Sequence, residues 1–199
     1  MTELRKSRIK TVLRYTWPLY LVGAVLVGLL LNFIFNITHQ VPGYKTLTIF
    51  VSGEVTDSKT LRNELLTKYE DKELKSVSLI TANPNEGHYN TKLTIPGYSS
   101  ADVLIIPASK LENLDVPYFA LDLKDELITT YYSGYSIYKQ NEVNYGIKIN
   151  KELVSSYMSL PNEECYMFLN GASVNLGEYS NKPIKEHDLA LQLVKYWGM

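Results

Sequence analysis

One stretch of the chain carries no charged side chain over 30 residues, from Tyr15 to Tyr44. Within it, residues 17–37 read WPLYLVGAVLVGLLLNFIFNI. A helix of that length measures about 31 Å, which matches a hydrocarbon core of roughly 30 Å. Trp17 and Tyr20 lie at its start, where amphipathic rings favour the headgroup zone. We therefore expect a transmembrane helix at 15–38 that contacts the lipid bilayer through residues 17–37.

The charges that flank this helix predict its orientation. Of the 20 basic and 21 acidic residues in the chain, five basic residues and one acid lie in residues 1–14: Arg5, Lys6, Arg8, Lys10, Arg14 and Glu3. Because positive flanks stay on the cytoplasmic side, we expect a cytoplasmic basic tip at 1–14 and an extracytoplasmic remainder. The predicted location is the cell membrane, with a single pass. A net charge of −1 argues against nucleic acid as a partner.

Two other interpretations of the apolar stretch were weighed. A cleaved signal peptide has an apolar region of about 7–15 residues and then small residues at a cleavage site. Here the region is longer and is followed by NITHQVPGY. A buried core helix of this length is expected to show a polar face, which this stretch lacks. An uncleaved anchor agrees best with the residues.

After a linker at 39–45, which contains Pro42 and Gly43, residues 46–199 alternate between strand and helix patterns. Apolar and β-branched runs predict strands at 46–51, 76–81, 101–107, 144–149 and 166–169. Apolar residues at helical spacing predict a helix that starts at Thr56 or Asp57 and runs to Tyr69, a helical turn at 108–114, and helices at 121–132 and 185–197. This order predicts an α/β domain with a mostly parallel sheet and right-handed crossovers.

The order of these segments resembles the first lobe of bacterial extracellular solute-binding proteins, which feed ABC importers. Residues Ala101-Asp102-Val103-Leu104 and Tyr145-Gly146-Ile147 stand where that family has its corresponding strands, and the likeness covers residues 45–150. Family members are about twice as long and close two lobes on a ligand. The resemblance therefore implies a single-lobe, membrane-anchored relative of the periplasmic-binding-protein fold, with an ABC-type importer as a partner.

The residues that carry catalytic chemistry elsewhere are scattered in this sequence. His39, His88 and His187 have no second ligand type at metal-site spacing, and no catalytic or phosphate-binding motif occurs. Cys165, the only cysteine, lies in an apolar run that is typical of a buried strand. We therefore expect a protein that is not an enzyme, with no cofactor and no metal.

A ligand site is predicted where the strands end. In open α/β sheets, ligands bind outside the carboxyl ends of the strands. Those ends carry Ser52, Gly53 and Asn83, and Tyr132 and Tyr135 would add a stacking surface if the chain returned over the same edge. The alternative is that the first three form ordinary turns and that the tyrosines are core residues.

Two functions follow from these patterns. The first is a membrane-tethered, non-catalytic binding domain for a small solute or for an importer or other membrane partner. The alternative is a structural or assembly subunit of a cell-envelope complex that has no small-molecule ligand.

The predicted topology can be tested with protease. Protease added outside intact cells or spheroplasts is expected to degrade residues 45–199, because the basic tip holds the N-terminus in the cytoplasm. Neutral substitutions at the five basic positions of residues 1–14 are expected to scramble insertion. Protection of residues 45–199 in the unsubstituted protein would reverse the orientation.

Overall fold

The computed structural model describes residues 3–39, 41–181 and 187–199, and it describes no side chain in 3–15 or 36–39. Two of the residues expected in the last helix, Lys185 and Glu186, lie outside this description, as do residues 1–2 of the basic tip. The chain divides into two compact units, residues 1–40 and residues 41–199. The first unit is a single helix, α1 (Glu3–His39).

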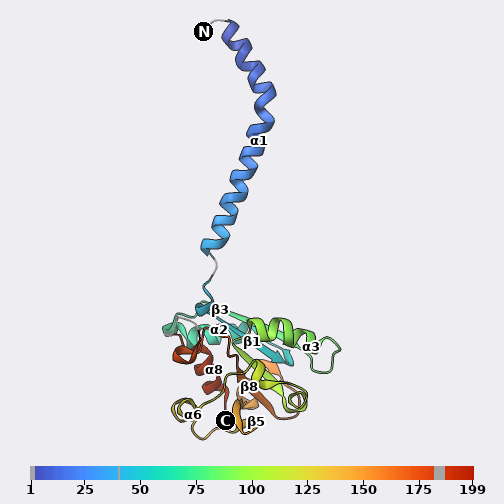
Figure 1. Cartoon of the computed structure of the whole chain (residues 1–199), viewed down its shortest axis with the longest axis vertical. Helices are drawn as coiled ribbons and strands as arrows, with labels where there is room; N and C mark the ends of the chain where they lie inside the picture. Colours follow the sequence, from blue (N-terminus) through green and yellow to red (C-terminus); the bar gives the residue numbers. More distant parts are fainter. Residues whose placement is uncertain (1–2, 40, 182–186) are drawn as a thin grey trace. The chain divides into compact units, whose positions relative to one another are not determined.

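Within α1, the segment Thr16–Phe35 is long and apolar enough to cross a membrane. Its 20 residues have a mean hydropathy of 2.2 on the Kyte–Doolittle scale. Length and apolarity are compatible with a membrane anchor and with a signal sequence near the N-terminus. Figure 1 shows the whole chain, with α1 drawn in blue.

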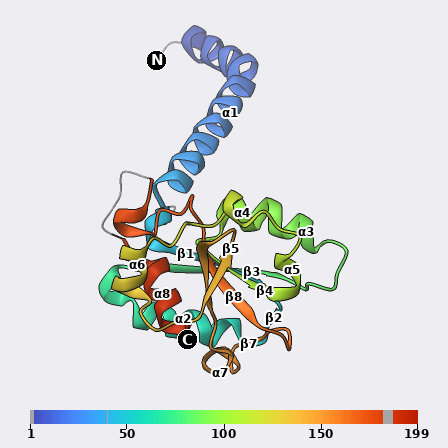
Figure 2. The same cartoon turned by 60° about the horizontal axis from the view of Figure 1, so that its bottom comes forward.

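The second unit is built on a sheet of six strands in the order β3-β1-β4-β8-β6-β5 (Figures 1 and 2). These strands are β1 (Thr46–Ser52), β3 (Ser76–Ala82), β4 (Val103–Pro107), β5 (Ile137–Gln140), β6 (Val143–Lys148) and β8 (Cys165–Leu169). A second, two-stranded sheet pairs β2 (Glu54–Val55) with β7 (Met158–Ser159).

Short helices fill most connections between the strands. The α-helices of the second unit are α2 (Ser58–Lys68), α3 (Tyr89–Lys92), α4 (Tyr98–Ser100), α5 (Ala108–Leu111), α6 (Asp125–Tyr131), α7 (Lys151–Val154) and α8 (Leu189–Trp197). The 3-10 turns are η1 (Gly43–Lys45), η2 (Glu70–Lys72), η4 (Val116–Tyr118) and η5 (Gly177–Tyr179), whereas η3 (Leu93–Gly97) is a π-helical turn. At α2 the N-cap is Asp57, whose carboxylate accepts a hydrogen bond from the backbone N–H of Thr60 at 2.9 Å.

The sheet is parallel in one half and antiparallel in the other. β1 pairs in parallel with β3 and with β4, as the strand–helix–strand order predicts. β8 is antiparallel to both β4 and β6, and β6 is antiparallel to β5. The sheet as a whole is therefore mixed rather than mostly parallel. The reason is that β8 comes from a distant part of the chain, after α7 and β7, and enters the sheet between β4 and β6 in the direction opposite to both.

Each face of the sheet buries its own core, because successive side chains of a strand point to opposite faces. On β1, Leu47, Ile49 and Val51 belong to one cluster and Phe50 belongs to the other. The first cluster also contains residues of α2, α6, α7 and α8, and the second contains residues of α3, η3, α5 and η4. Figure 2 shows α3, α4 and α5 together on one side of the sheet.

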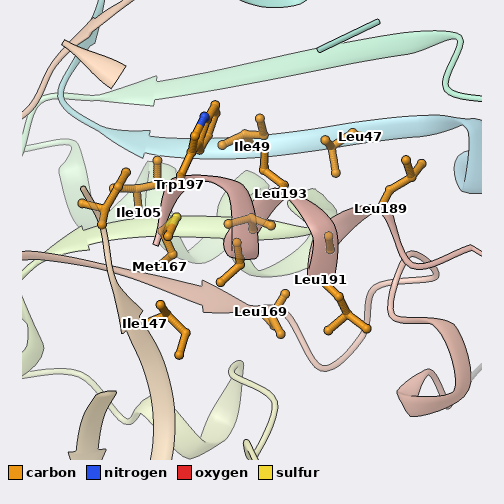
Figure 3. Packing of buried hydrophobic residues seen from close by; sticks show 14 of the residues in the cluster. Leu47, Ile49, Ile105, Ile147, Met167, Leu169, Leu189, Leu191, Leu193 and Trp197 are labelled. Carbon is orange, nitrogen blue, oxygen red and sulfur yellow. The ribbon is translucent and has the colours of Figure 1, made fainter. Parts of the chain in front are cut away.

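The last helix supplies much of the larger core. Leu189, Leu191, Leu193 and Trp197 of α8 pack against Leu47 and Ile49 of β1 and against residues of β4, β6 and β8 (Figure 3). Trp197 is 1% exposed. Burying an aromatic ring of this size contributes about 1.5–3 kcal/mol or more. Residues from both ends of the second unit therefore share one core.

Strand β5 was not predicted, because its hairpin turn lacks the usual sequence pattern. The turn between β5 and β6 is Asn141-Glu142, and both residues have positive φ, 52° and 66°. Two positive φ values are typical of a type I′ turn, for which Asn-Gly is the common sequence. Because glutamate stands in place of glycine at the second position of the turn, the sequence did not predict this hairpin.

A substitution at Ile105 tests the position of the central strand β4. Its side chain is 0% exposed in the middle of β4. The change Ile105→Ala is expected to lower the free energy of unfolding of residues 41–199 by roughly 2–5 kcal/mol, through lost burial and a new cavity. Urea unfolding measures it, with Ile95→Ala as the control, since Ile95 is 66% exposed. A cost below about 1 kcal/mol at Ile105 would contradict the placement of β4.

Candidate functional site

Ser52 lies at the carboxyl end of β1 and is fully buried. Its hydroxyl forms a hydrogen bond with the hydroxyl of Tyr89, at 2.8 Å between the two oxygens. Burial raises the pKa of Tyr89 to about 12, so this phenol stays protonated at physiological pH. The Ser52 hydroxyl is thus already hydrogen-bonded to another residue of the chain.

Gly53 follows, and a neighbouring backbone covers it. A Cβ at this position would lie 2.4 Å from the carbonyl oxygen of Ser159 in β7. Only glycine permits this close approach. The close backbone approach predicted at Gly53 therefore exists, but it is made by β7 rather than by a ligand.

Asn83 lies beside these residues, because Ser52 and Ala82 are register partners in the parallel pair β1–β3. The Asn83 side chain is exposed, and its Oδ1 accepts a hydrogen bond from the backbone N–H of Asn85 at 3.0 Å. This bond forms a turn of the Asx type. The structure thus brings Ser52, Gly53 and Asn83 together, and a ligand contact at these residues stays a prediction.

Tyr132 and Tyr135 lie elsewhere. Tyr132 is 0% exposed, belongs to the core cluster of α8, and donates its hydroxyl to the carbonyl of Leu191 at 3.2 Å. Tyr135 donates its hydroxyl to the carbonyl of Lys195 at 3.0 Å. Because Ser52 and Tyr132 belong to opposite faces of the sheet, they cannot contact one small ligand. Tyr132 is a core residue and presents no ring surface for stacking.

A cavity of about 400 Å³ opens at the same end of the sheet, beside β6 and β8. Most of the charged side chains that line this cavity form ion pairs or hydrogen bonds with other residues of the chain. Lys148 forms an ion pair with Glu164 at 2.5 Å, which holds the pKa of the Glu164 carboxyl below its ordinary value. Lys151 donates to the carbonyls of Pro161 and Glu163. Burial raises the pKa of Cys165, which also lines this cavity, to about 11, so its thiol stays protonated.

A second cavity, of about 420 Å³, lies at the opposite end of the strands, and we call it the amino-end cavity. Three segments of the chain line it. The first contributes Thr94, Tyr98 and Ser99, the second is residues 117–120, and the third is residues 170–172. Asn181 also lines the cavity. None of these residues is charged. A smaller cavity of about 200 Å³ adjoins it, because Ser99, Asn170 and Ala172 line both.

Aromatic rings form one wall of the amino-end cavity. Tyr98 stacks on Phe119, with ring centroids 4.3 Å apart and planes at 8°. Tyr118 meets Tyr98 edge-on, at 6.1 Å and 62°. Phe119 is buried, Tyr98 is half-buried and Tyr118 is 75% exposed. The two tyrosine rings therefore form a corner with one deep and one exposed side.

A π-helical turn carries the hydroxyl groups of another wall. Turns of this type are rare and occur frequently at functional sites. Thr94 lies within η3 and donates its hydroxyl to the carbonyl of Asn90 at 2.7 Å, and Ser99 donates to the carbonyl of Ile95. Since their protons are used in this way, both oxygens can act only as hydrogen-bond acceptors, and that of Ser99 already accepts from the hydroxyl of Ser100 at 3.2 Å.

Asn170 holds the cavity walls together. It is 3% exposed, and its amide nitrogen donates to the carbonyls of Tyr98 and Ala101 at 2.8 and 2.7 Å. Its Oδ1 accepts from the backbone N–H of Ala172 at 2.9 Å. One side chain at the end of β8 thus fixes the segments that carry Tyr98 and Ala172.

Asp102 continues this network under the smaller cavity. It is 7% exposed and accepts hydrogen bonds from the backbone N–H of Thr48, at 2.7 Å, and from the hydroxyl of Ser173. Asn175 donates to the carbonyl of Thr46 at 2.9 Å. The Oδ1 of Asn175 has no hydrogen-bond partner among the described residues, but the other bonds of this network join the segments that carry Thr46, Thr48, Asp102 and Ser173. The amino-end cavity therefore has preformed walls.

The sequence analysis did not single out Tyr98, Tyr118 or Asn170. Each lies beside a residue that interrupts regular structure: Gly97, Pro117 and Gly171. Glycine and proline mark loops, where binding residues are frequent, and this was the only local pattern that pointed to these three residues. Among the described residues, no group of three or more His, Cys, Asp and Glu could hold a metal ion.

Comparisons with known proteins give only distant structural likenesses. No protein-family model matches the chain, and no curated protein matches it. Three chains of solved structures match. One is an ABC substrate-binding protein from Listeria monocytogenes in complex with cycloalternan, with 15% sequence identity and a TM-score of 0.31. The match covers 56% of this chain and 32% of that protein. A likeness at this level does not extend that protein's ligand to the present chain.

Asp102 makes the stability of the second unit depend on pH. Burial raises the pKa of its carboxyl, although the hydrogen bonds from Ser173, Thr48 and Asn175 oppose the rise. A raised folded-state pKa contributes stability that is complete below the unfolded pKa of about 4 and is lost as pH rises through the folded pKa. The change Asp102→Asn removes this titration.

Urea unfolding of both proteins across a pH series measures the effect. The free energy of unfolding of the unsubstituted protein minus that of Asp102→Asn is expected to fall as pH rises above about 4. Other titrating groups are the same in both proteins and cancel in this difference. A difference that stays constant over the series would contradict the raised pKa.

Proposed function

We propose that this chain is a membrane-anchored, non-catalytic binding protein. Its apolar helix holds it in the cell membrane with the N-terminus in the cytoplasm, and its second unit binds a small solute or a membrane partner outside. The observation that carries this proposal is the amino-end cavity, in which exposed and half-buried aromatic rings meet hydroxyl and amide groups. Small-molecule sites commonly combine mostly apolar walls with a few fixed polar groups.

The volume and the rigidity of the cavity support a binding role. About 420 Å³ lies within the range of roughly 300–1,000 Å³ that is typical of ligand pockets. Asn170 is buried and fixes two of the walls by hydrogen bonds, so little ordering is required on binding. The anchor is supported by the length and apolarity of Thr16–Phe35 and by the five basic residues that precede it.

Ligand-dependent thermal unfolding tests the binding role. The full chain, purified in a detergent without a sugar headgroup, is heated with amino acids, neutral sugars, sugar phosphates, nucleosides and short peptides. A bound solute at a hundredfold excess over its Kd stabilises by about 2.7 kcal/mol, which raises the Tm of a domain of this size by roughly 5–10 °C. The expected result is such a rise with one class.

Substitutions of two exposed side chains show, in the same experiment, at which end of the sheet the solute binds. Asn83→Ala changes the predicted carboxyl-end residues, and Tyr118→Ala changes the amino-end cavity. We expect the rise in Tm to be reduced by Tyr118→Ala and kept by Asn83→Ala. No rise with any class, together with a membrane protein that co-purifies in stoichiometric amount, would favour the alternative of an assembly subunit.

A further inference from the structure

The hydrogen-bonding groups of the amino-end cavity divide into two fixed kinds. Thr94 and Ser99 offer acceptor oxygens, because their protons are already donated to the carbonyls of Asn90 and Ile95. The Ser99 oxygen keeps one lone pair for a ligand, since the other accepts from the hydroxyl of Ser100. The hydroxyls of Tyr98 and Tyr118 form no hydrogen bond with any residue that the structure describes. Burial raises the pKa of Tyr98 to about 12, so its phenol stays a donor. Asn181, which is exposed at the rim, adds an amide that both donates and accepts.

A matching ligand must therefore donate at some positions and accept at others over a short distance. Hydroxyl groups do both. A ligand that carries several of them on one ring satisfies the acceptors on the π-helical turn and the donors on the tyrosines together. A hydrocarbon chain would leave these polar groups without water or a partner, which costs free energy.

The described lining of the cavity favours a neutral ligand. Among the residues that the structure describes, which end at Asn181 on this side and resume at His187, none that lines the cavity is charged. A phosphate, carboxylate or ammonium group moved from water into such a cavity loses hydration and gains no counter-ion. The described part of the lining therefore favours a ligand without charge.

The aromatic corner provides the apolar contact. Phe119 covers one face of Tyr98, and Tyr118 stands at 62° to Tyr98 with 75% of its surface exposed. A ring with an apolar face can pack against one tyrosine while its rim reaches the polar groups. Asn170 is the positioning residue, since its polar atoms bind backbone groups of the walls.

We propose that the amino-end cavity binds a neutral saccharide, with Tyr98 and Tyr118 as stacking surfaces and with Thr94, Ser99 and Asn181 as partners of the sugar hydroxyls. This inference rests on the proposed binding function and names the ligand class of that site. It places the site at the amino ends of the parallel strands, away from Ser52, Gly53 and Asn83.

Calorimetric titration of the full chain tests the ligand class. The protein is held in lauryl dimethylamine oxide micelles, which carry no sugar headgroup, and is titrated with a panel of neutral mono-, di- and trisaccharides. Glucose 6-phosphate and adenosine are the comparison probes. We expect binding of at least one neutral saccharide, and binding of glucose 6-phosphate that is weaker than that of glucose by about tenfold or more, because the phosphate finds no counter-ion.

Variants then locate the bound sugar. Tyr118→Ala is expected to weaken the Kd by about tenfold through loss of the ring face, and Tyr118→Phe, which keeps the ring, is expected to weaken it less. Leu153→Ala is the matched control, since Leu153 is 46% exposed on α7 and lies outside the cavity lining. Its Kd is expected to be unchanged. Because Tyr118 is exposed, its variants are expected to fold, and the Tm of each variant checks this.

The outcomes separate this inference from the proposed function. Saccharide binding that Tyr118→Ala leaves unchanged, or tight binding of glucose 6-phosphate or adenosine in place of neutral sugars, would overturn the assignment of the ligand class to this cavity. If no saccharide binds but another class raises the Tm of the full chain, the binding function stands without the saccharide. If no class of solute binds, the saccharide assignment and the proposed solute-binding function are both contradicted.

Discussion

The antiparallel pairing of β4 with β8 is the constraint on which the rest of the second unit depends. Five register pairs join Val103–Pro107 to Cys165–Leu169 in the middle of the sheet. This pairing brings Asn170 and Ser173 to the amino end of β4, where they bind the backbone near Tyr98 and the carboxylate of Asp102. It also places the start of β8 beside the end of β6, so both halves of the sheet meet at β8. The cavities at both ends of the sheet follow from this one long-range contact.

The local sequence pattern was sufficient to predict most of the regular elements. Each of these elements buries one face, so its apolar residues recur with the period of a strand or of a helix. The runs that became β1, β3 and β4 are apolar and β-branched, and Leu61 and Leu65 have helical spacing on α2. What the sequence did not indicate depends on non-local or unusual geometry. The direction of β8 is set by its partner rather than by its residues, β5 follows from two positive φ values at Asn141-Glu142, and β2 and β7 are too short to show a period.

The candidate site differs from the prediction for a related reason. The rule for open α/β sheets placed it at the carboxyl ends of the strands, and the structure does bring Ser52, Gly53 and Asn83 together there. However, β7 covers Gly53, and Tyr89 occupies the Ser52 hydroxyl. Tyr132, expected beside them, lies in the core of the opposite face. At the amino end, by contrast, a π-helical turn, an aromatic corner and a buried amide combine into a cavity whose residues are far apart in sequence.

Hydrogen–deuterium exchange of the full chain with and without a neutral saccharide tests the central claim most directly, since it reports where ligand binding protects the backbone. The account predicts added protection in three segments that are distant in sequence, residues 94–99, 117–120 and 170–172, and no change at residues 52–53 and 83–85. Protection confined to the carboxyl-end residues, or no change in any of the three segments while the sugar is bound, would contradict it.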